Sequence, residues 1–176
     1  MEYDPAAHTV KVRRPLDAAP DLVFAAFADP LLVRRWLRPS PEVRLEVLNY
    51  DFRIGGAYRF AYRVPNGDLM HVNGVFELIE PPSRLIFSWI IEPPDEHADV
   101  QSEVHVTITR AGTGSVLEIH HIKLDRTGAP QRHAEGWRGA TDQLAALLGS
   151  LEERQWLRMR SRRAFVSRSP TRACMK

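Results

Sequence analysis

The chain has 176 residues, of which 44% are hydrophobic and 26% charged, and this composition is typical of one globular domain with a substantial core. Its 24 basic and 22 acidic residues give a net charge of +2, which excludes a strong electrostatic field over the whole chain. The single cysteine, Cys174, excludes an internal disulfide and favours a reducing, cytoplasmic location, and no apolar run is long enough to span a membrane.

The N-terminal region predicts one strand followed by two short helices. His8 to Arg14 alternates valine with polar residues, which is typical of a strand. Pro20 suits the first turn of a helix over residues 21–29. Asp29-Pro30 ends this helix because the residue before a proline disfavours helical backbone angles. A second short helix covers residues 31–37.

The middle of the chain predicts six further strands. They cover residues 43–48, 57–64, 69–79, 84–91, 102–109 and 115–124. The clearest hairpin turns are Pro65 to Asp68 and Ala111 to Gly114, which are rich in turn-forming residues. We expect the strand over residues 69–79 to be interrupted at Gly74. Consecutive strands joined by short turns indicate an antiparallel sheet.

A long amphipathic helix follows, from Gly128 to Leu148. Its apolar residues recur at helical spacing and form one stripe of Trp137, Ala140, Thr141, Leu144, Leu147 and Leu148. Pro130 suits its first turn, and Gly149 suits its end. Because neither this helix nor a one-sided sheet can bury its apolar face alone, the two should pack together. We therefore predict an α+β fold in which a curved sheet grips the helix, with a pocket between them.

Five stretches in this order resemble one known family. They are VRRPLDAAPDLVFAAFADPLLVRRWL, DFRIGGAYRF, GVFELIEPPSRLIFSW, SEVHVTITRAGTGSVLEIHH, and GW followed by LAALL. Together they are similar to the activator-of-heat-shock-protein-ATPase homologue family of the SRPBCC superfamily, also called START-like or birch-pollen-allergen-like. The resemblance covers residues 8–149.

The resemblance implies a helix-grip fold, with a seven-stranded antiparallel sheet around a long C-terminal helix and two short helices after the first strand. It also implies an apolar cavity for a lipid, polyketide, hormone or other hydrophobic molecule. Some members of the superfamily are cyclases, dehydratases or hydroxylase components, and the family takes its name from a co-chaperone domain. Homodimers are common among such domains, so we expect a homodimer rather than a monomer.

Nine residues are candidates for the wall of this pocket. They are Trp36, Tyr58, Phe60, Tyr62, His71, Phe87, Trp89, His121 and Trp137. Binding pockets are mostly apolar with a few polar groups, which fits this set. The alternative for each aromatic member is ordinary packing in the core.

Histidines on the predicted strands are candidates for chemistry. His120 and His121 are adjacent on a strand and must face opposite sides, with His121 sharing the face of Ile119. His121 and His71 are the candidates for general acid–base catalysis in a pocket. There is no HxH pattern and no cysteine partner, so we expect no metal site. No GxSxG motif is present, so a catalytic triad is not expected either, and nothing in the sequence calls for a cofactor.

The charge is concentrated at the C-terminus. Residues 150–176 hold eight basic and two acidic side chains, so this segment carries +6 and residues 1–149 carry −4. We interpret residues 1–149 as one domain and residues 150–176 as a flexible basic extension. Nucleic acid or an anionic surface is expected as a partner only for this extension.

Three functions remain open from the sequence. The first is binding of a small hydrophobic molecule without an assigned reaction, the second is a cyclase or dehydratase that uses a pocket histidine or tyrosine, and the third is a protein-interaction module of the co-chaperone type. A histidine or tyrosine with a shifted pKa in the pocket would favour the enzyme. A filled cavity with an exposed apolar patch would favour the interaction module.

Overall fold

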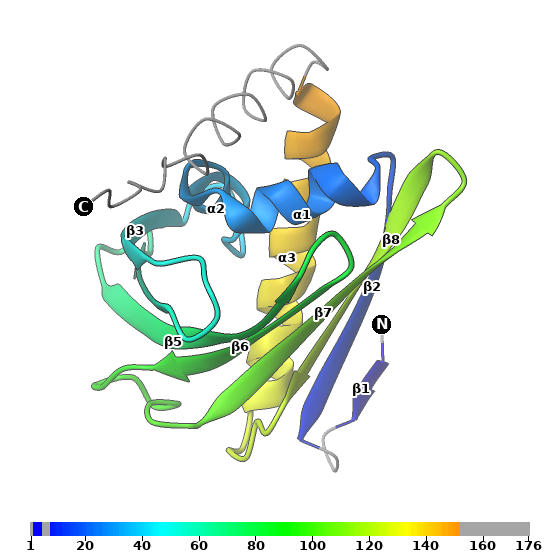
Figure 1. Ribbon diagram of the computed structural model, residues 1–176. Coiled ribbons are helices and arrows are strands. Elements are labelled where there is room, and N and C mark those ends of the chain that lie inside the picture. The colour runs from blue at the N-terminus through cyan, green and yellow to red at the C-terminus, as the bar shows by residue number, and fades with distance from the viewer. Residues whose placement is uncertain (1, 5–7, 152–176) are drawn as a thin grey trace, which may run out of the picture.

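A single antiparallel sheet curves around one long helix (Figure 1). The structure is a computed structural model that describes residues 2–4 and 8–151. Across this part of the chain the sheet has eight strands in the order β1-β2-β8-β7-β6-β5-β4-β3. Their bounds are β1 Glu2–Asp4, β2 Thr9–Leu16, β3 Arg44–Tyr50, β4 Ala57–Arg63, β5 Leu69–Glu80, β6 Arg84–Ile91, β7 Ser102–Ala111 and β8 Gly114–Ile122.

Three helices accompany the sheet within the described ranges: α1 Pro20–Ala28, α2 Pro30–Trp36 and α3 Ala129–Ser150. Each has a proline in its first turn, where the missing N–H costs no hydrogen bond. Asp29 separates the first two, and its side chain accepts a hydrogen bond from the backbone N–H of Leu31 at 2.8 Å. None of these helices is both long and apolar enough to cross a bilayer.

The long helix crosses the concave face of the sheet, and the two short helices lie across its C-terminal half (Figure 1). Its predicted stripe is buried at Trp137, Ala140, Thr141, Leu144 and Leu147. Because strand residues alternate between faces, the strands present one apolar face to this helix. Tyr58, Phe60 and Tyr62 on β4 are examples, and all three are buried.

The predicted α+β helix-grip fold is confirmed, since all seven predicted strands and all three predicted helices are present. The sequence did not indicate the eighth strand, β1, which extends the edge of the sheet by pairing with β2. The long helix ends at Ser150 rather than before Gly149. Residues 152–176, which include most of the predicted basic extension, lie outside the described residues.

The predicted interruption at Gly74 is wrong, because β5 runs through this residue as one strand. Gly74 instead makes room for the Tyr58 side chain and the Ser88 carbonyl. The Tyr58 hydroxyl donates a hydrogen bond to the Ser88 carbonyl at 2.6 Å, across the position of Gly74. A Cβ at Gly74 would lie 2.1 Å from that carbonyl oxygen and 2.7 Å from the Tyr58 hydroxyl. The pairing of β5 with β6 shifts register further along, between Phe76 and Leu78.

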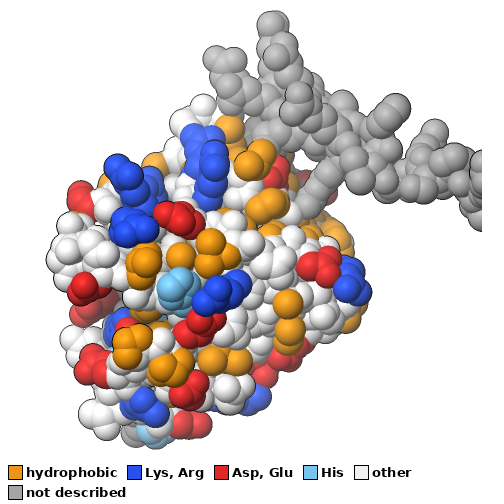
Figure 2. Space-filling view, turned by 90° about the vertical axis from the view of Figure 1, so that its left-hand side faces the viewer, with side chains coloured by type: hydrophobic (Ala, Val, Ile, Leu, Met, Phe, Trp, Pro, Cys, Tyr) orange, Lys and Arg blue, Asp and Glu red, His pale blue; other side chains and the backbone are white. Residues whose placement is uncertain are grey.

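One face of the molecule has a mixed surface, on the side of β3, β4 and β5. Figure 2 shows hydrophobic side chains gathered near the middle of this face, around a histidine that has basic and acidic side chains beside it. Among the described residues, the large hydrophobic side chains that are exposed include Leu48 and Leu69, which belong to these strands.

Candidate functional site

A cavity of about 620 Å³ lies between the sheet and the N-terminal half of α3. This volume lies within the range of small-molecule pockets. Its walls come from five parts of the chain: Leu37, Arg38, Pro39 and Val43 between α2 and β3; Tyr62 and Val64 on and after β4; Asp68, Leu69, Met70 and His71 at the start of β5; Trp89, Ile91, Glu92, Pro93, Pro94 and Asp95 on and after β6; and Arg132, His133, Gly136, Trp137 and Ala140 on α3.

Four of the nine predicted pocket residues lie in this wall: Tyr62, His71, Trp89 and Trp137. The other five lie outside it and pack in the core: Trp36, Tyr58, Phe60, Phe87 and His121. Trp36 lies on α2 and donates its indole N–H to the Ala26 carbonyl at 2.9 Å. Tyr58, Phe60, Phe87 and His121 lie on strands of the sheet and are buried.

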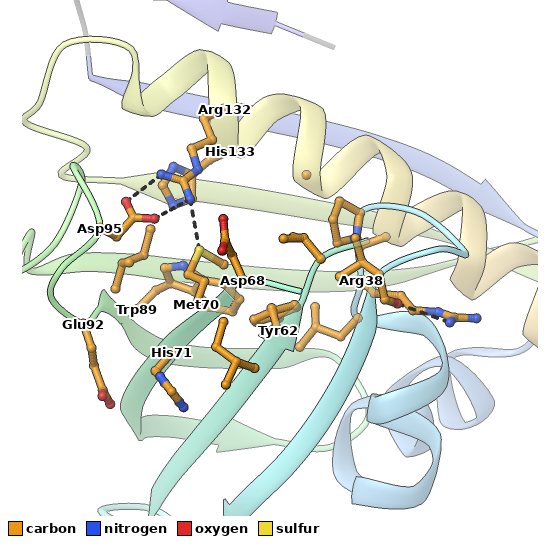
Figure 3. Close-up of a pocket in the computed structure, with 18 of the residues that line it drawn as sticks. Arg38, Tyr62, Asp68, Met70, His71, Trp89, Glu92, Asp95, Arg132 and His133 are labelled. Carbon is orange, nitrogen blue, oxygen red and sulfur yellow. Dashed lines mark hydrogen bonds and ion pairs between the residues drawn. The ribbon is translucent and has the colours of Figure 1, made fainter. Parts of the chain in front are cut away.

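His71 borders the cavity from its rim. Val72, its neighbour on β5, points to the interior with no exposed surface, so alternation places His71 on the outer face of the sheet. Figure 3 shows the His71 side chain turned away from the other cavity residues. On the same outer face, Glu92 accepts hydrogen bonds from Arg59 and Asn73, and its pKa falls to about 2, chiefly because of the Arg59 guanidinium.

Three aromatic side chains form the apolar wall. The ring of Trp89 lies 6.5 Å from that of Tyr62 and 5.6 Å from that of Trp137, measured between centroids. Burial raises the pKa of the Tyr62 phenol, so this hydroxyl stays protonated at neutral pH. Within residues 8–151, the indole N–H of Trp89 is the one buried side-chain polar atom that lacks a hydrogen-bond partner.

His121 lies behind this wall in a closed series of hydrogen bonds. The Trp137 indole N–H donates to its Nδ1 at 3.0 Å. Since Nδ1 accepts, the proton of the neutral ring is on Nε2, which donates to the Ser102 hydroxyl at 2.8 Å. The Ser102 hydroxyl donates in turn to the Trp89 carbonyl at 2.6 Å. Burial holds the pKa of His121 well below its usual range, so the ring is neutral and has no free nitrogen.

A charged cluster closes one end of the cavity (Figure 3). The Arg132 guanidinium on α3 donates to both carboxylate oxygens of Asp95, at 2.7 Å each, and we call this pair the Asp95–Arg132 clasp. Arg132 also donates to Nδ1 of His97 at 2.9 Å and contacts the Met70 sulfur at 3.0 Å. Nε2 of His97 donates to the Thr127 carbonyl at 3.1 Å. The cluster thereby joins the loop after β6 to the start of α3.

His133 presents a different environment from His121. Its Nδ1 lies 2.7 Å from the Ala129 carbonyl oxygen, which can only accept, so Nδ1 carries the proton. Burial lowers the pKa of His133 to about 4, so the ring is neutral at pH 7. Its Nε2 is then a hydrogen-bond acceptor, and it has no partner among the described residues. The ring lines the cavity, and Nε2 is not fully enclosed by protein atoms.

The cavity offers no metal site. Within residues 2–4 and 8–151, no group of three histidine, cysteine, aspartate or glutamate side chains is placed to hold a metal ion. Asp95, one of its carboxylates, is paired with Arg132 instead.

Comparison with known proteins agrees with this architecture. Residues 17–149 match the family model described as Activator of Hsp90 ATPase homolog 1-like protein. The chain belongs to this family. No curated protein matches it. Membership of the family supports a ligand-binding or interaction module in general terms.

Solved structures of family-like proteins share the fold. A protein from Chromobacterium violaceum is 27% identical and has a TM-score of 0.74, over 80% of this chain and 96% of that one. One from Arthrobacter aurescens is 23% identical with a TM-score of 0.75, over 85% and 91%. The AHSA1 protein from Silicibacter pomeroyi is 22% identical with a TM-score of 0.70, over 80% and 97%. The last two similarities concern the fold alone.

Sequence reasoning missed three polar residues that line this family member's cavity, Asp95, Arg132 and His133, and it also missed His97, which contacts Arg132 beside the cavity. His133 was within reach, because it lies four residues before Trp137 and therefore on the same face of α3. Asp95 and His97 lie in an irregular loop, where no periodicity indicates which side chains turn inward. Their pairing with Arg132 depends on contacts between residues 37 positions apart for Asp95 and 35 for His97.

Proposed function

We propose that this protein binds a small hydrophobic molecule in the cavity between its sheet and α3. The observation that carries the proposal is an open volume of about 620 Å³ bounded mainly by apolar and aromatic side chains. Concave, mainly apolar spaces with a few polar groups are the usual form of small-molecule sites. Burial of an apolar ligand there would contribute roughly 25 cal/mol for each Å² removed from water.

The cavity does hold a tyrosine and a histidine with shifted pKa values, but both shifts move away from neutral pH and therefore support binding over acid–base catalysis. The Tyr62 phenol has its pKa raised by burial, and His133 has its pKa lowered to about 4 for the same reason. Effective general acids and bases have pKa values near the working pH. Both groups are therefore better suited to donate or accept a hydrogen bond than to move a proton.

Native mass spectrometry of the protein purified from its host, with identification of the released molecule, is the direct test. We expect a bound hydrophobic compound of small mass. A protein that is empty in this measurement, and that takes up no apolar probe afterwards, would overturn the proposal.

A pair of glycines on α3 supplies matched variants. A Cβ at Gly136 would have no atom within 4 Å, and Gly136 lines the cavity, so Gly136→Leu would fill it. A Cβ at Gly149 also has open space, but Gly149 lies outside the cavity. Both changes introduce the same side chain at a glycine of α3. We expect Gly149→Leu to keep the bound molecule and Gly136→Leu to lose it, and retention by Gly136→Leu would count against the site.

Several finer expectations accompany the proposal. We also propose a cytoplasmic location, which the single cysteine favours, and a homodimer, which the family resemblance implies. The role of the basic extension stays a prediction, as does the division into residues 1–149 and 150–176.

A further inference from the structure

The charges around the cavity determine which ligands fit. Arg132 is the basic side chain next to His133, and both oxygens of Asp95 occupy its guanidinium. Arg38 lies on the other side of the cavity, and Figure 3 shows its guanidinium turned away from it. Arg38 donates there to the backbone carbonyls of Arg35, Pro41 and Val43. Neither cation is thus placed to receive a carboxylate.

The acceptors of the cavity, in contrast, have capacity to spare. Asp68 lines the cavity and is exposed, and its carboxylate has no basic partner among the described residues and accepts a hydrogen bond only from the Asn66 side chain. His133 contributes the lone pair of Nε2, because its proton is on the Nδ1 that faces Ala129. An anionic ligand would be repelled by these groups and would lose its hydration without compensation. A ligand with a hydrogen-bond donor would instead satisfy one of them.

The Tyr62 hydroxyl further restricts the chemical class of ligand that fits the cavity. It borders the cavity and has no hydrogen-bond partner among the residues that the structure describes, so it can donate to a ligand oxygen. An N–H group on a ligand serves only the acceptors of the cavity, whereas a hydroxyl serves both acceptors and donors. A hydroxyl is therefore the polar group that suits this cavity best.

We propose that the cavity selects an uncharged, apolar molecule that carries a hydroxyl group, and that this hydroxyl donates a hydrogen bond to Nε2 of His133. The inference rests on the proposed function, since it specifies the ligand of the same cavity. His133 is well placed for the role because it lies one helical turn from Trp137, so the polar anchor and the aromatic wall share one face of α3.

Three probes of one shape test the proposal: 2-naphthol, naphthalene and 2-naphthoate, titrated calorimetrically into the full chain at pH 7. One additional hydrogen bond to a buried group contributes about 1.4 kcal/mol, which is about tenfold in Kd. We expect 2-naphthol to bind about tenfold more tightly than naphthalene, and 2-naphthoate to bind more weakly than 2-naphthol. In His133→Phe the ring shape remains but the proposed acceptor is lost, so most of the preference for 2-naphthol over naphthalene should disappear.

His105→Phe is the matched control, because His105 lies on β7 outside the cavity and pairs with Glu103. It should keep the preference for 2-naphthol. If wild-type protein binds 2-naphthol and naphthalene equally, or if His133→Phe keeps the preference, the hydroxyl inference is overturned while the hydrophobic cavity stands. If none of the three probes binds, both proposals are overturned.

A second measurement does not depend on the folding of a variant. The ¹⁵N resonance of an unprotonated imidazole nitrogen moves upfield when that nitrogen accepts a hydrogen bond. In wild-type protein labelled at histidine, 2-naphthol should shift the Nε2 signal of His133, and naphthalene should not. An unchanged signal with bound 2-naphthol would contradict the proposed contact.

Discussion

Trp137 donates its indole N–H to Nδ1 of His121 across 3.0 Å, and this bond joins α3 to β8. The same histidine continues through Ser102 to the backbone of β6, so one buried series of hydrogen bonds connects the helix to three strands. Because each member has its partner, the series acts as a structural lock behind the cavity. This satisfied state also explains why His121, although buried, offers nothing to a ligand.

The two tryptophans of the cavity wall give the first prediction. Trp137 has a bonded N–H, whereas the N–H of Trp89 is buried without a partner among the described residues. Replacement by phenylalanine removes similar apolar area from each. Trp137→Phe also leaves Nδ1 of His121 unsatisfied, which costs about 1–3 kcal/mol, whereas Trp89→Phe removes an unpaired donor. Urea denaturation should show a larger loss in the free energy of unfolding for Trp137→Phe than for Trp89→Phe. Equal losses in the two variants would refute this account.

The second prediction concerns acid stability. His121 has a folded-state pKa well below 6.5, and His133 has one of about 4, both because of burial. Below about pH 6.5 the unfolded chain binds protons that the folded chain does not. The free energy of unfolding should therefore be highest above pH 6.5 and fall as the pH is lowered towards 5. Each such histidine contributes at most about 1.4 kcal/mol per pH unit.

His121→Leu isolates one of these contributions. It should lower stability at pH 7, because Trp137 and Ser102 lose their partner, and it should reduce the slope between pH 6.5 and 5 by up to one proton. Ile119→Ala is the control. Ile119 lies on the same buried face of β8, and its replacement removes no titratable group. It should keep the wild-type slope. A slope in His121→Leu that equals the wild-type value would show that His121 is not held neutral.

The third prediction concerns the Asp95–Arg132 clasp. Arg132→Lys keeps the charge but not the planar fork that binds both carboxylate oxygens. We expect a loss of about 1 kcal/mol or less in global stability, because the pair is partly exposed. The effect on the local stability of the loop after β6 should be larger than the effect on global stability. The backbone N–H of Asp99, which donates to the Ile91 carbonyl in the same loop, should exchange with deuterium faster.

Arg84→Lys provides the comparison for this experiment. Arg84 pairs with Glu80 on the exposed surface, through one nitrogen at 3.1 Å. Hydrogen exchange in the loop after β6 should match wild type in Arg84→Lys. If Arg132→Lys leaves the exchange of Asp99 unchanged as well, the clasp does not hold this loop against α3.

Local patterns predicted the fold well because each element buries one face. The stripe on α3 and the alternation at Tyr58, Phe60 and Tyr62 specify which side chains point inward, and the structure buries them. The same patterns could not say how deep each residue lies. Tyr62 reaches the cavity and Tyr58 does not, because the empty volume depends on how the α2–β3 segment and α3 close over the end of the sheet.

Polar residues were harder to place, since their neighbours come from distant parts of the chain. The interpretation of Gly74 as an interruption failed for this reason. A glycine in a strand signals either a break in the strand or the close approach of another part of the protein. Only the position of Tyr58 on the neighbouring strand β4 decides between them. Residue type alone favours His71 as a pocket residue. Because its neighbour Val72 is buried, His71 faces the other side of the sheet and reaches only the rim of the cavity.

The last prediction uses two further changes on α3 that look alike in sequence. A Cβ at Gly139 would lie 1.7 Å from the Pro39 carbonyl oxygen, so the helix packs against the α2–β3 segment with no room for a methyl group. A Cβ at Gly136 meets no atom within 4 Å. Gly136→Ala should raise stability by up to about 1 kcal/mol through helix propensity. Gly139→Ala should lower it by about 1–3 kcal/mol, because the segment that closes the cavity must shift. Thermal denaturation of both variants measures the difference, and a Gly139→Ala protein as stable as Gly136→Ala would show that α3 does not approach Pro39 this closely.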